Sequence, residues 1–572
     1  MMKREDIRMP IQDVVKGLTW ANSLFSLKLP IRALLFVVSW MAFLFAQPDL
    51  SLWACSLTAS LGYGCLLSAI SDCPVRVGAR AVFLWCFFGE LYHFSWLVSD
   101  KYVGKFILFP WLFVSTFLGI SFVFFFLCLR RLIFTCRPLT VIIGGAFLWV
   151  FLEKLRYLGF FSGLSFDFSG FSLTGNPYYA QCASFLGVFG LTLLVMSSSL
   201  TFYFCIRSLR RSFLVGWILI NGIPYLAGGA FYHFHAGKLL SDNRYLSVAL
   251  VQPAFKPETG GMGVLRERLL ALCRRITVKP DLIVFPEAMI PCGLESHACS
   301  LTEFQDIITR NFGAVRLNFT KPELNYRDYF EWLSSYFDCG IVIGTEVSIY
   351  NSGRRFFYNS AVLLSADEGE MFRYDKRILV PIGEYLPGGR VGAFIVGKYF
   401  PQYFSPYFKD RGRNTELMRS SRLPPFGVSI CYEETFGDLI RIYKLKGASF
   451  LVNLTNDMWY PRSRLPEFHF LHGVLRNIEL GLSSVRACNT GVTGGVDSLG
   501  RIVAKLPSEN SFREALPEVL IVKLPLYSYT TPYSFLGDAC LMYWSLFATL
   551  FVFVLLLCPT PPYCQKRRNK IN

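Results

Sequence analysis

Eight long apolar runs restrict the fold of this chain more than any other feature of its sequence. Each run has roughly twenty predominantly apolar residues, the length at which a helix crosses the hydrocarbon layer of a bilayer. Their approximate limits are 31–47, 50–70, 81–98, 106–128, 139–157, 180–205, 213–232 and 535–558. Because 53% of all residues are apolar and the mean hydropathy is +0.40, a purely soluble protein is a poor alternative. We expect an α-helical membrane bundle of about eight transmembrane helices.

Basic residues are concentrated in the short links between these runs. A net charge of +17 indicates a nucleic-acid partner only when it gathers on one soluble face, so we predict no nucleic acid here. The basic links and tail hold Arg76, Arg80, Arg130, Arg131, Arg137, Arg207, Arg210, Arg211, Lys566, Arg567, Arg568 and Lys570. Positive charge favours the cytoplasmic side. Both termini are therefore expected in the cytoplasm, and the long interval before the last run is expected outside it.

That interval has the character of a soluble α/β domain, with short apolar stretches alternating with polar and helical segments. The predicted strands are 247–252, 282–285, 341–345, 360–364, 427–431, 450–453, 492–497 and 519–523, with a helix at about 466–484. The chain thus divides into a seven-helix membrane region at 1–240, an α/β domain at 241–530, and a last span with a basic tail at 531–572. The first run follows Met1-Met2-Lys3-Arg4 and has no small-residue cleavage site after it, which predicts a retained anchor.

Seventeen cysteines are dispersed along the chain. They form no disulfide framework, and no Cys-x-x-Cys pair with metal spacing accompanies a histidine pair, so we predict no metal. Whether two cysteines of the external domain pair by oxidation stays open.

Three segments of the α/β domain each place a reactive side chain at or just beyond the end of a strand. In the first, an apolar strand that begins at Asp281 is followed by Pro286 and Glu287. A partly desolvated carboxylate at this position can act as a base. Taken alone, Pro-Glu after a strand is more often a helix start or a solvated strand end.

The second segment runs from Tyr374 to Pro387 and contains Lys376 and Glu384. A lysine can stabilise an oxyanion without losing its proton. In isolation, Lys376 is more simply a surface charge with Glu384 as its partner.

The third segment runs from Pro425 to Glu434, and its apolar strand ends at Cys431. A thiol becomes a nucleophile when a base takes its proton or a cation favours the thiolate. Alone, this segment is more simply explained by a buried structural cysteine.

Together the three segments resemble the carbon-nitrogen hydrolase (nitrilase) superfamily over about residues 245–525. The resemblance implies an αββα sandwich in which Glu287 is the general base, Lys376 the oxyanion stabiliser and Cys431 the nucleophile.

Two further segments are similar to motifs of that superfamily. Asn453 to Trp459 resembles its Asn-x-Thr-Asn-Asp strand end, and Arg486 to Thr493 resembles its Arg-Ala-x-Asn-x-Gly segment. His469 and Arg476 fit the helix between them as structural or site-supporting residues. Trp459 either packs in the core or lines a path for the acyl chain.

Seven apolar runs before such a domain and one after it resemble the apolipoprotein N-acyltransferase family, as does the run from Lys376 to Pro387. The resemblance implies that Glu384, Tyr432 and Glu433 support the site or bind substrate, with Trp459 beside them. It also implies a multi-pass protein of the bacterial inner membrane whose catalytic domain is periplasmic.

In that family a fatty acyl chain passes from a phospholipid to the N-terminal amine of a diacylglyceryl-cysteine lipoprotein. The resemblance implies a two-step reaction through a thioester on Cys431, in which Glu287 handles the protons. A thioester is reactive enough for attack by an amine, so neither a cofactor nor a metal is expected.

Three segments depart from the family pattern or leave their role open. Residues 294–327 are long for the family and suggest an inserted surface loop. Residues 159–171 match only loosely an aromatic-rich external loop, so phospholipid contacts are not carried over to them. Residues 389–424 are rich in apolar and aromatic side chains and form either a lid that dips into the membrane or an ordinary packed insertion.

Two rival functions are weighed against acyl transfer. A membrane-tethered amidase would pass the acyl group to water, but one span would suffice to tether it. A transporter with a degenerate domain would need ionisable residues inside its spans. Only Glu90, His93 and the region of Glu153 stand out there, which are too few to mark an ion path.

Overall fold

The computed structural model describes residues 26–51, 54–99, 104–159, 164–315, 319–365, 372–386, 408–506 and 516–557, and the single residues 24, 101, 317, 388, 389, 394, 397 and 398. The chain forms two compact units. The helical unit comprises Met1–Leu158, Phe166–Tyr232 and Leu536–Asn572, and the sandwich unit comprises Gly159–Ser165 and His233–Phe535. Our domain limits near residues 240 and 530 stay predictions.

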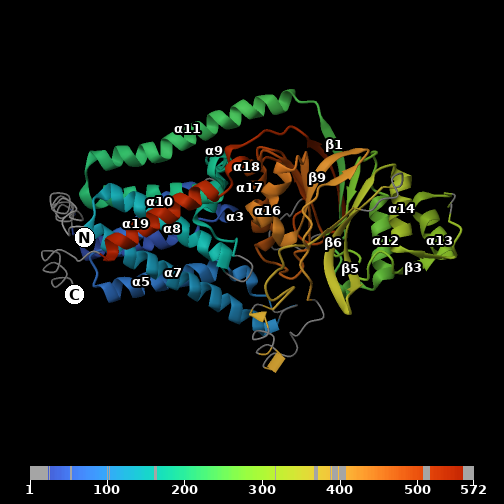
Figure 1. Ribbon diagram of the computed structural model, residues 1–572, viewed down its shortest axis with the longest axis horizontal. Helices are drawn as coiled ribbons and strands as arrows, with labels where there is room; N and C mark the ends of the chain where they lie inside the picture. The colour runs from blue at the N-terminus through green and yellow to red at the C-terminus, as the bar shows by residue number, and fades with distance from the viewer. Residues whose placement is uncertain are drawn as a thin grey trace, which may run out of the picture. The chain divides into compact units, whose positions relative to one another are not determined.

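Eight helices lie where the eight apolar runs were predicted (Figure 1). They are α2 (Leu29–Leu44), α4 (Ala54–Ile70), α5 (Val75–His93), α7 (Leu108–Thr135), α8 (Pro138–Gly159), α10 (Ala183–Ser208), α11 (Arg211–Ser241) and α19 (Ala539–Leu557). Five of them, α7, α8, α10, α11 and α19, are long and apolar enough to cross a membrane. The described parts of α2 and α4 are shorter, and α5 is not among the five, so the full count of about eight spans stays a prediction.

Short elements connect these helices at their ends. They are α3 (Pro48–Ser51), η1 (Ser95–Leu97), η2 (Gly104–Ile107), η3 (Ser169–Gly175) and α9 (Pro177–Gln181).

Aromatic rings and small residues pack the interior of the helical unit. Phe43 stacks on Trp85 with ring centroids 4.3 Å apart, and Phe122 meets Trp149 at 4.8 Å. Gly64 lies so close to α10 that an added Cβ atom would approach a backbone oxygen to 2.5 Å. In a bilayer the hydrophobic effect does not drive helices together, so they associate by close packing. Small residues at helix crossings allow that close approach.

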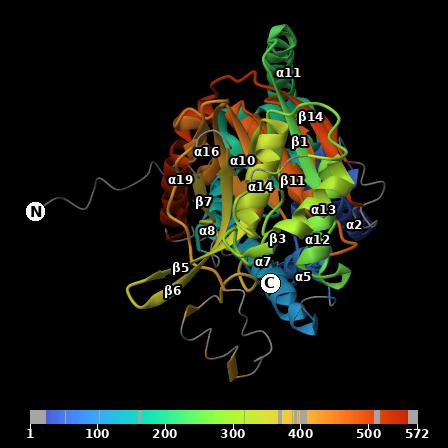
Figure 2. The same cartoon turned by 90° about the vertical axis from the view of Figure 1, so that its right-hand side faces the viewer.

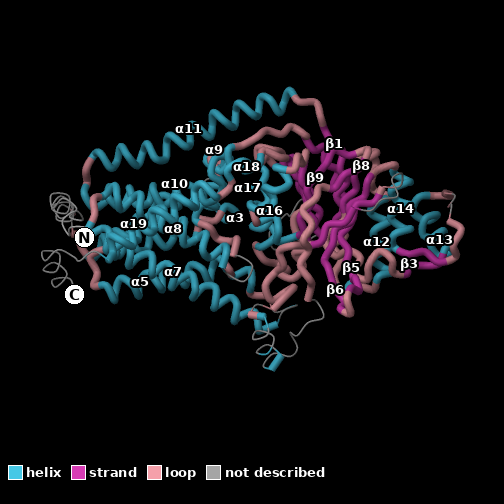
Figure 3. The backbone as a smooth tube through the Cα atoms, in the orientation of Figure 1, coloured by secondary structure: helices cyan, strands magenta, loops and turns pink. Residues whose placement is uncertain are grey.

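The sandwich unit contains two six-stranded sheets (Figure 3). The first has the order β14-β1-β2-β5-β6-β7 and the second the order β13-β12-β11-β10-β9-β8. The strands of the first are β1 (Tyr245–Gln252), β2 (Leu282–Val284), β5 (Gly340–Asn351), β6 (Arg354–Leu364), β7 (Phe372–Asp375) and β14 (Glu518–Pro525). The strands of the second are β8 (Met418–Ser420), β9 (Leu423–Ile430), β10 (Phe450–Thr455), β11 (Ser483–Cys488), β12 (Gly494–Val496) and β13 (Ile502–Lys505).

Each sheet has a parallel centre, β1-β2-β5 in one and β9-β10-β11 in the other. Helices α12 (Met262–Cys273) and α14 (Tyr326–Phe337) cover the first sheet, whereas α16 (Gly437–Leu445) and α17 (Leu465–Leu480) lie beside the second. Figure 2 looks onto the first layer, with α12, α13 (Leu301–Phe312) and α14 in front of the strands. Strands covered on both faces are apolar along nearly their whole length. Two sheets with helices packed beside each of them confirm the expected αββα sandwich.

The sequence missed several elements and misjudged one segment. Helix α17 ends at Leu480 because Gly481 adopts a left-handed conformation (φ +58°), and β11 then begins at Ser483. Residues 294–327 are not a surface loop. They contain the two-stranded ribbon of β3 (His297–Ser300) and β4 (Glu323–Asn325) and the helix α13, which buries Phe304, Ile307 and Ile308 in the core. Ile307 and Ile308 are spaced three and four residues after Phe304, so the three lie on one face of a helix, and burying this face makes the segment part of the core.

Three predictions fall mostly or wholly on residues outside the described part of the chain. They concern the N-terminal Lys3 and Arg4, the basic tail, and the proposed lid at 389–424, of which only Gly389, Phe394, Gly397, Lys398 and residues from 408 onward are described.

Candidate active site

The three sequence-predicted catalytic residues lie just beyond strand ends in the two sheets. Glu287 follows β2, Lys376 follows β7, and Cys431 follows β9 as the first residue of the short helix η6 (Cys431–Thr435). Cys431 has a φ of +53°, which non-glycine residues seldom adopt. Such a sharp turn between strand and helix holds the thiol in one direction, and strained backbone of this kind is often found at functional sites.

Lys376 lies between two carboxylates. Its Nζ atom donates to Glu287 Oε1 at 3.0 Å and to Glu384 Oε1 at 2.9 Å. Asn359 Nδ2 donates to the same two oxygens, at 2.8 and 3.2 Å. The backbone N–H of Val380 donates to Glu384 Oε2 at 2.8 Å. Donors from β6 and from the segment that contains Lys376 thus surround the two carboxylates, and Glu287 and Glu384 share one cation.

Charge and burial set the protonation of the lysine and the thiol in this cluster. Burial alone would lower the pKa of Lys376, but the carboxylates of Glu287 and Glu384 outweigh it and hold the pKa well above its usual value. The ammonium therefore stays charged. Burial and the negative charge of Glu287 raise the pKa of the Cys431 thiol, although Lys376 opposes them. The resting thiol is therefore neutral and needs a base before it can attack.

Glu433 links the lysine segment to the cysteine segment. Its carboxylate accepts from the hydroxyl of Tyr374 at 2.9 and 2.8 Å, and from the backbone N–H groups of Arg377, Ile378 and Ile430 at 2.6, 3.0 and 2.8 Å. Burial raises the pKa of Glu433, and the backbone donors oppose that rise. The side chain is completely buried. It is therefore a positioning residue that holds together the turns carrying Lys376 and Cys431.

The remaining predicted residues occupy different environments. Tyr432 is buried and its ring packs against Phe436 at 4.9 Å. Burial raises its pKa to about 12. Trp459 has 40% of its surface exposed, so it does not pack in the core. Ser165, in the loosely matching segment at 159–171, shares a hydrogen bond of 2.6 Å with Thr435 at the end of η6.

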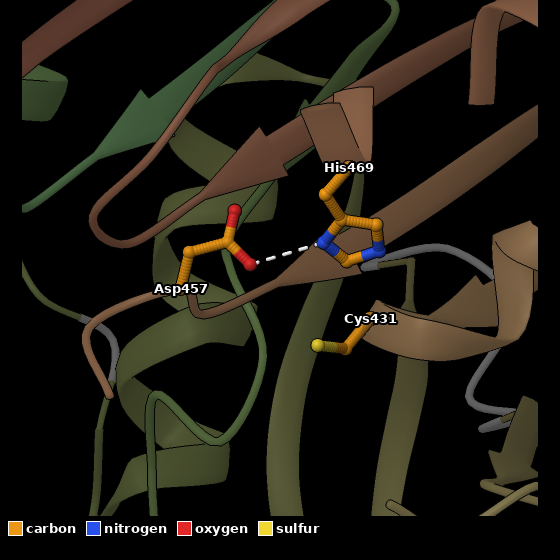
Figure 4. Close-up of side chains that lie close together, drawn as sticks. All are labelled: Cys431, Asp457 and His469. Carbon is orange, nitrogen blue, oxygen red and sulfur yellow. Dashed lines mark hydrogen bonds and ion pairs between the residues drawn. The ribbon is translucent and has the colours of Figure 1, made fainter. Parts of the chain in front are cut away.

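A second charged cluster lies beside Cys431 (Figure 4). Reactive atoms of Cys431, Asp457 and His469 all lie within 4.8 Å of one another. His469 Nδ1 is 3.0 Å from Asp457 Oδ1, and its Nε2 is 3.3 Å from Glu434 Oε1. Arg486 donates to Asp457 Oδ2 at 2.9 Å and also to Glu434. Two carboxylates are thus matched by a guanidinium and an imidazole.

Thiol, imidazole and carboxylate form a donor set that zinc also uses. Here, however, Asp457 and Glu434 already accept from Arg486, and a bound ion would occupy the nucleophile. The arrangement is therefore better explained as a network of paired charged side chains beside the thiol than as a site for a resident metal.

Sequence reasoning did not identify Asn359 or Tyr374, and it assigned no role to Asp457. Asp457 lies inside a motif that was recognised, so its position gave a signal. Asn359 lies within β6 and Tyr374 within β7, and neither position differs in pattern from an ordinary strand residue. Their roles come from pairing between β6 and β7, which places Ser360 opposite Asp375.

The six described cysteines of the sandwich unit, Cys273, Cys292, Cys299, Cys339, Cys431 and Cys488, are free thiols. None of these six cysteines forms a disulfide in this structure.

Comparison with known proteins supports both units. A family model for carbon-nitrogen hydrolases matches residues 247–529, and one for the apolipoprotein N-acyltransferase N-terminal domain matches residues 33–201. An apolipoprotein N-acyltransferase from Chlamydia muridarum is 39% identical over 543 residues, covering 93% of this chain and 97% of the relative. The chain belongs to the apolipoprotein N-acyltransferase family. It is an acyltransferase with a nitrilase-like domain.

Two other members of this family were compared with the chain. The apolipoprotein N-acyltransferase from Chlamydia pneumoniae is 39% identical over 516 residues, covering 89% of this chain and 94% of the relative. Apolipoprotein N-acyltransferase 1 from Treponema denticola is 26% identical over 431 residues, covering 68% and 72%. The similarity thus extends across the helical and the sandwich units.

Proposed function

We propose that this acyltransferase moves a fatty acyl chain from a phospholipid to the N-terminal amine of diacylglyceryl-cysteine in lipoproteins, through a thioester on Cys431. The observation that carries the proposal is the buried ammonium of Lys376 between Glu287 and Glu384, with Cys431 in the same electrostatic cluster. A charged donor fixed in a buried site can stabilise an oxyanion without reorganising. The apolar helical unit suits substrates that are lipids.

In the first half-reaction, Glu287 takes the proton of the Cys431 thiol and the thiolate attacks the ester carbonyl of the phospholipid. Lys376 stabilises the resulting oxyanion. The ester C–O bond breaks, the glycerol oxygen recovers the proton from Glu287, and a lysophospholipid leaves. The thioester remains on Cys431.

In the second half-reaction, the neutral amine of diacylglyceryl-cysteine attacks the thioester carbonyl. The C–S bond breaks, Glu287 passes the amine proton to the departing thiolate, and an amide forms. An amide is far less reactive than a thioester, so the transfer needs no further source of energy. Water must be kept from the thioester, because hydrolysis would lose the acyl chain.

Glu384, Tyr432, Glu433 and Trp459 serve this reaction as supporting or substrate-binding residues. Glu384 holds Lys376, and Glu433 holds the two turns that carry Lys376 and Cys431. Trp459 is exposed enough to contact an acyl chain. We further propose a multi-pass protein of the bacterial inner membrane, with cytoplasmic termini and a periplasmic sandwich unit, on the distribution of basic links.

Intact-mass analysis of the full chain in detergent with phospholipid tests the proposal. The wild type is expected to gain the mass of one fatty acyl group and to lose it when a diacylglyceryl-cysteine peptide is added, as the peptide gains an amide-linked chain. Cys431→Ser should not form the thioester. Cys292→Ser, which changes an exposed thiol, is the matched control and should behave as the wild type does.

Two outcomes would favour the rival functions. If the acyl group passes only to water while the peptide is unchanged, the protein is an amidase-like hydrolase. If folded wild-type protein that binds phospholipid forms no adduct, Cys431 is not the nucleophile and the transporter hypothesis returns.

A further inference from the structure

A second buried cluster of polar residues lies in the helical unit, outside the site described above. Glu90 and His93 belong to the last turn of α5, Gln47 lies between α2 and α3, and Asp167 precedes η3. Gln47, Glu90 and His93 are only 3%, 4% and 3% exposed. One ligand-type atom each of Glu90, His93 and Asp167 lies within 4.8 Å of the others.

The orientation of His93 directs one ring nitrogen at oxygen atoms. Its Nε2 atom is 3.1 Å from the backbone oxygen of Phe43, which only a protonated Nε2 can satisfy. Nδ1 is then 3.1 Å from Asp167 Oδ1 and 4.0 Å from Glu90 Oε2. A ring nitrogen whose partner nitrogen donates to a backbone carbonyl is the usual arrangement of a metal-binding histidine.

A proton on Nδ1 would satisfy Asp167 but would leave other atoms of the cluster without a partner. Among the described residues, Glu90 Oε2 and Gln47 Oε1 are buried and accept no hydrogen bond. The amide of Gln47 lies at the same place, with Nε2 3.3 Å from His93 Nδ1 and also beside Asp167. Turning this amide over would bring Oε1 into the cluster. Buried acceptors without a partner are costly, and a cation would satisfy both.

The charges of the surroundings also favour a cation. Glu90, Asp167 and the neighbouring Glu153 are buried carboxylates. Arg156, 3.7 Å from Glu153, is the guanidinium that faces them and donates to the backbone oxygen of Asp167. The three carboxylates outnumber the guanidinium of Arg156 and the imidazole of His93 when all of them are ionised, the state that a bound cation would favour. Charges buried away from water are normally matched by opposite charges or by metal ions.

We propose that Glu90, His93 and Asp167, with the amide oxygen of Gln47, bind one divalent transition-metal ion that joins the ends of α2 and α5 to the segment before η3. Separations of 3.1, 3.3 and 4.0 Å between donor positions suit an ion bound at about 2.0–2.2 Å from each ligand. The donors are nitrogen and oxygen without a thiolate, a set that suits Zn²⁺ or Mn²⁺. As Zn²⁺ the ion is structural, since four protein ligands fill its tetrahedral coordination.

Metal analysis of the full chain in detergent tests the site. Protein loaded with Zn²⁺ or Mn²⁺ and passed through a desalting column is expected to retain about one ion per chain. EDTA should remove the ion and lower the thermal midpoint, and adding the metal back should restore it. His93→Gln and Asp167→Asn should each abolish retention.

Cys431→Ser is the control for the cluster of Cys431, Asp457 and His469, which has its own metal-type donors. It should retain the ion as the wild type does. If instead Cys431→Ser loses the ion and His93→Gln keeps it, the ion belongs to the sandwich unit and the proposal is overturned. The proposal also fails if the wild type retains neither metal and EDTA leaves the thermal midpoint unchanged.

Gln47→Glu keeps the test decisive if the first variants do not fold. The added carboxylate should tighten Zn²⁺ binding, so the variant should be more stable than the wild type in Zn²⁺ and less stable in EDTA. If the variant is less stable than the wild type in both conditions, no ion lies at the site and the proposal is wrong.

Discussion

The two buried charged clusters differ in how their carboxylates are neutralised. In the sandwich unit, Glu287 and Glu384 share the ammonium of Lys376 and the amide of Asn359. In the helical unit, Glu90 Oε2 and Gln47 Oε1 lack a hydrogen-bond partner within the described chain. The first cluster contains its own cation, whereas the second has buried acceptor atoms without a donor among the described residues.

We expect this difference to separate the proposed catalytic site from the proposed metal site. A buried cation held by two carboxylates is available to a developing oxyanion, because neither the charge nor its position has to change during the reaction. A cluster of acceptors without enough donors can instead be stabilised by a bound ion. We expect the pairing of Lys376 with Glu287 and Glu384 to determine both the activity and the stability of the sandwich unit.

Lys376→Met should have the largest effect. It removes the only cation between Glu287 and Glu384 among the described residues. Loss of the oxyanion donor should lower the transfer rate by about 10²–10³-fold. Leaving buried carboxylates without their partner should also cost about 3–5 kcal/mol of the free energy of unfolding. Transfer to a diacylglyceryl-cysteine peptide and urea unfolding of the full chain measure the two effects.

The double variant Lys376→Met, Glu384→Gln separates activity from stability. It removes one of the two uncompensated carboxylates, so it should recover part of the lost stability but none of the transfer rate. Near-normal transfer by either variant would show that Lys376 does not stabilise the oxyanion.

Glu433→Gln should have a smaller effect on the rate. The carboxylate now accepts hydrogen bonds from the backbone N–H groups of Arg377, Ile378 and Ile430. In the variant the NH₂ group of the amide would replace one carboxylate oxygen, so it would face either the first two of these donors or the third. Unsatisfied buried donors cost about 1–3 kcal/mol, and a displaced lysine turn should lower the transfer rate about 10–100-fold. The pH profile of transfer should keep its shape, because Glu433 positions the reacting groups without exchanging protons with them.

Glu518→Gln is the matched control for that change. Glu518 is half-exposed and pairs with Arg275 at 3.2 Å, a surface ion pair worth about 0–1 kcal/mol. If it lowers the rate as much as Glu433→Gln does, the effect of Glu433 is not one of position.

Glu287→Gln should change the titration of the Cys431 thiol, an effect that is smaller than the changes in stability above and is read separately from the loss of transfer. The negative charge of Glu287 helps to raise the pKa of Cys431, so its removal should lower that pKa. Thiolate then forms at lower pH, and alkylation of Cys431 by iodoacetamide should begin at lower pH although transfer is lost. Intact mass measured across a pH series follows the alkylation.

Cys292→Ser reduces the background from the exposed thiol. A shift of the Cys431 alkylation profile to higher pH in Glu287→Gln would contradict the proposed electrostatic relation between Glu287 and the thiol.

Local pattern was sufficient to locate the eight long apolar helices, most of α17 and most of the central strands, but it did not locate α12, α13, α14 or α16. An apolar run of twenty residues has few stable alternatives to a helix in a lipid environment. Strands such as β1 and β10, buried on both faces, are recognisable as short apolar runs. The strands β7, β8 and β13 were missed because they are short or lie at sheet edges, where the pattern is weak.

The strand-end motifs also indicated Glu287 and Cys431, and the run from Lys376 to Pro387 indicated Lys376, although β7, the strand before it, was not predicted. It did not reveal that Asn359 donates to both carboxylates, nor that Glu433 accepts from two different turns. Such contacts join residues that are far apart along the chain. They depend on the pairing of strands and on which side chains the pairing places together.

The sequence by itself determined an apolar helical region and a nitrilase-like domain, and it indicated the proposed reactive side chains, because periodicity and strand-end motifs are local properties. Only the tertiary structure decided the partners of each charge. It placed one ammonium between two carboxylates in the sandwich unit, and it gathered Gln47, Glu90, His93 and Asp167 from separate segments in the helical unit. The physical reason is that the energy of a buried charge depends on neighbours in space, and these neighbours are set by packing rather than by distance along the chain.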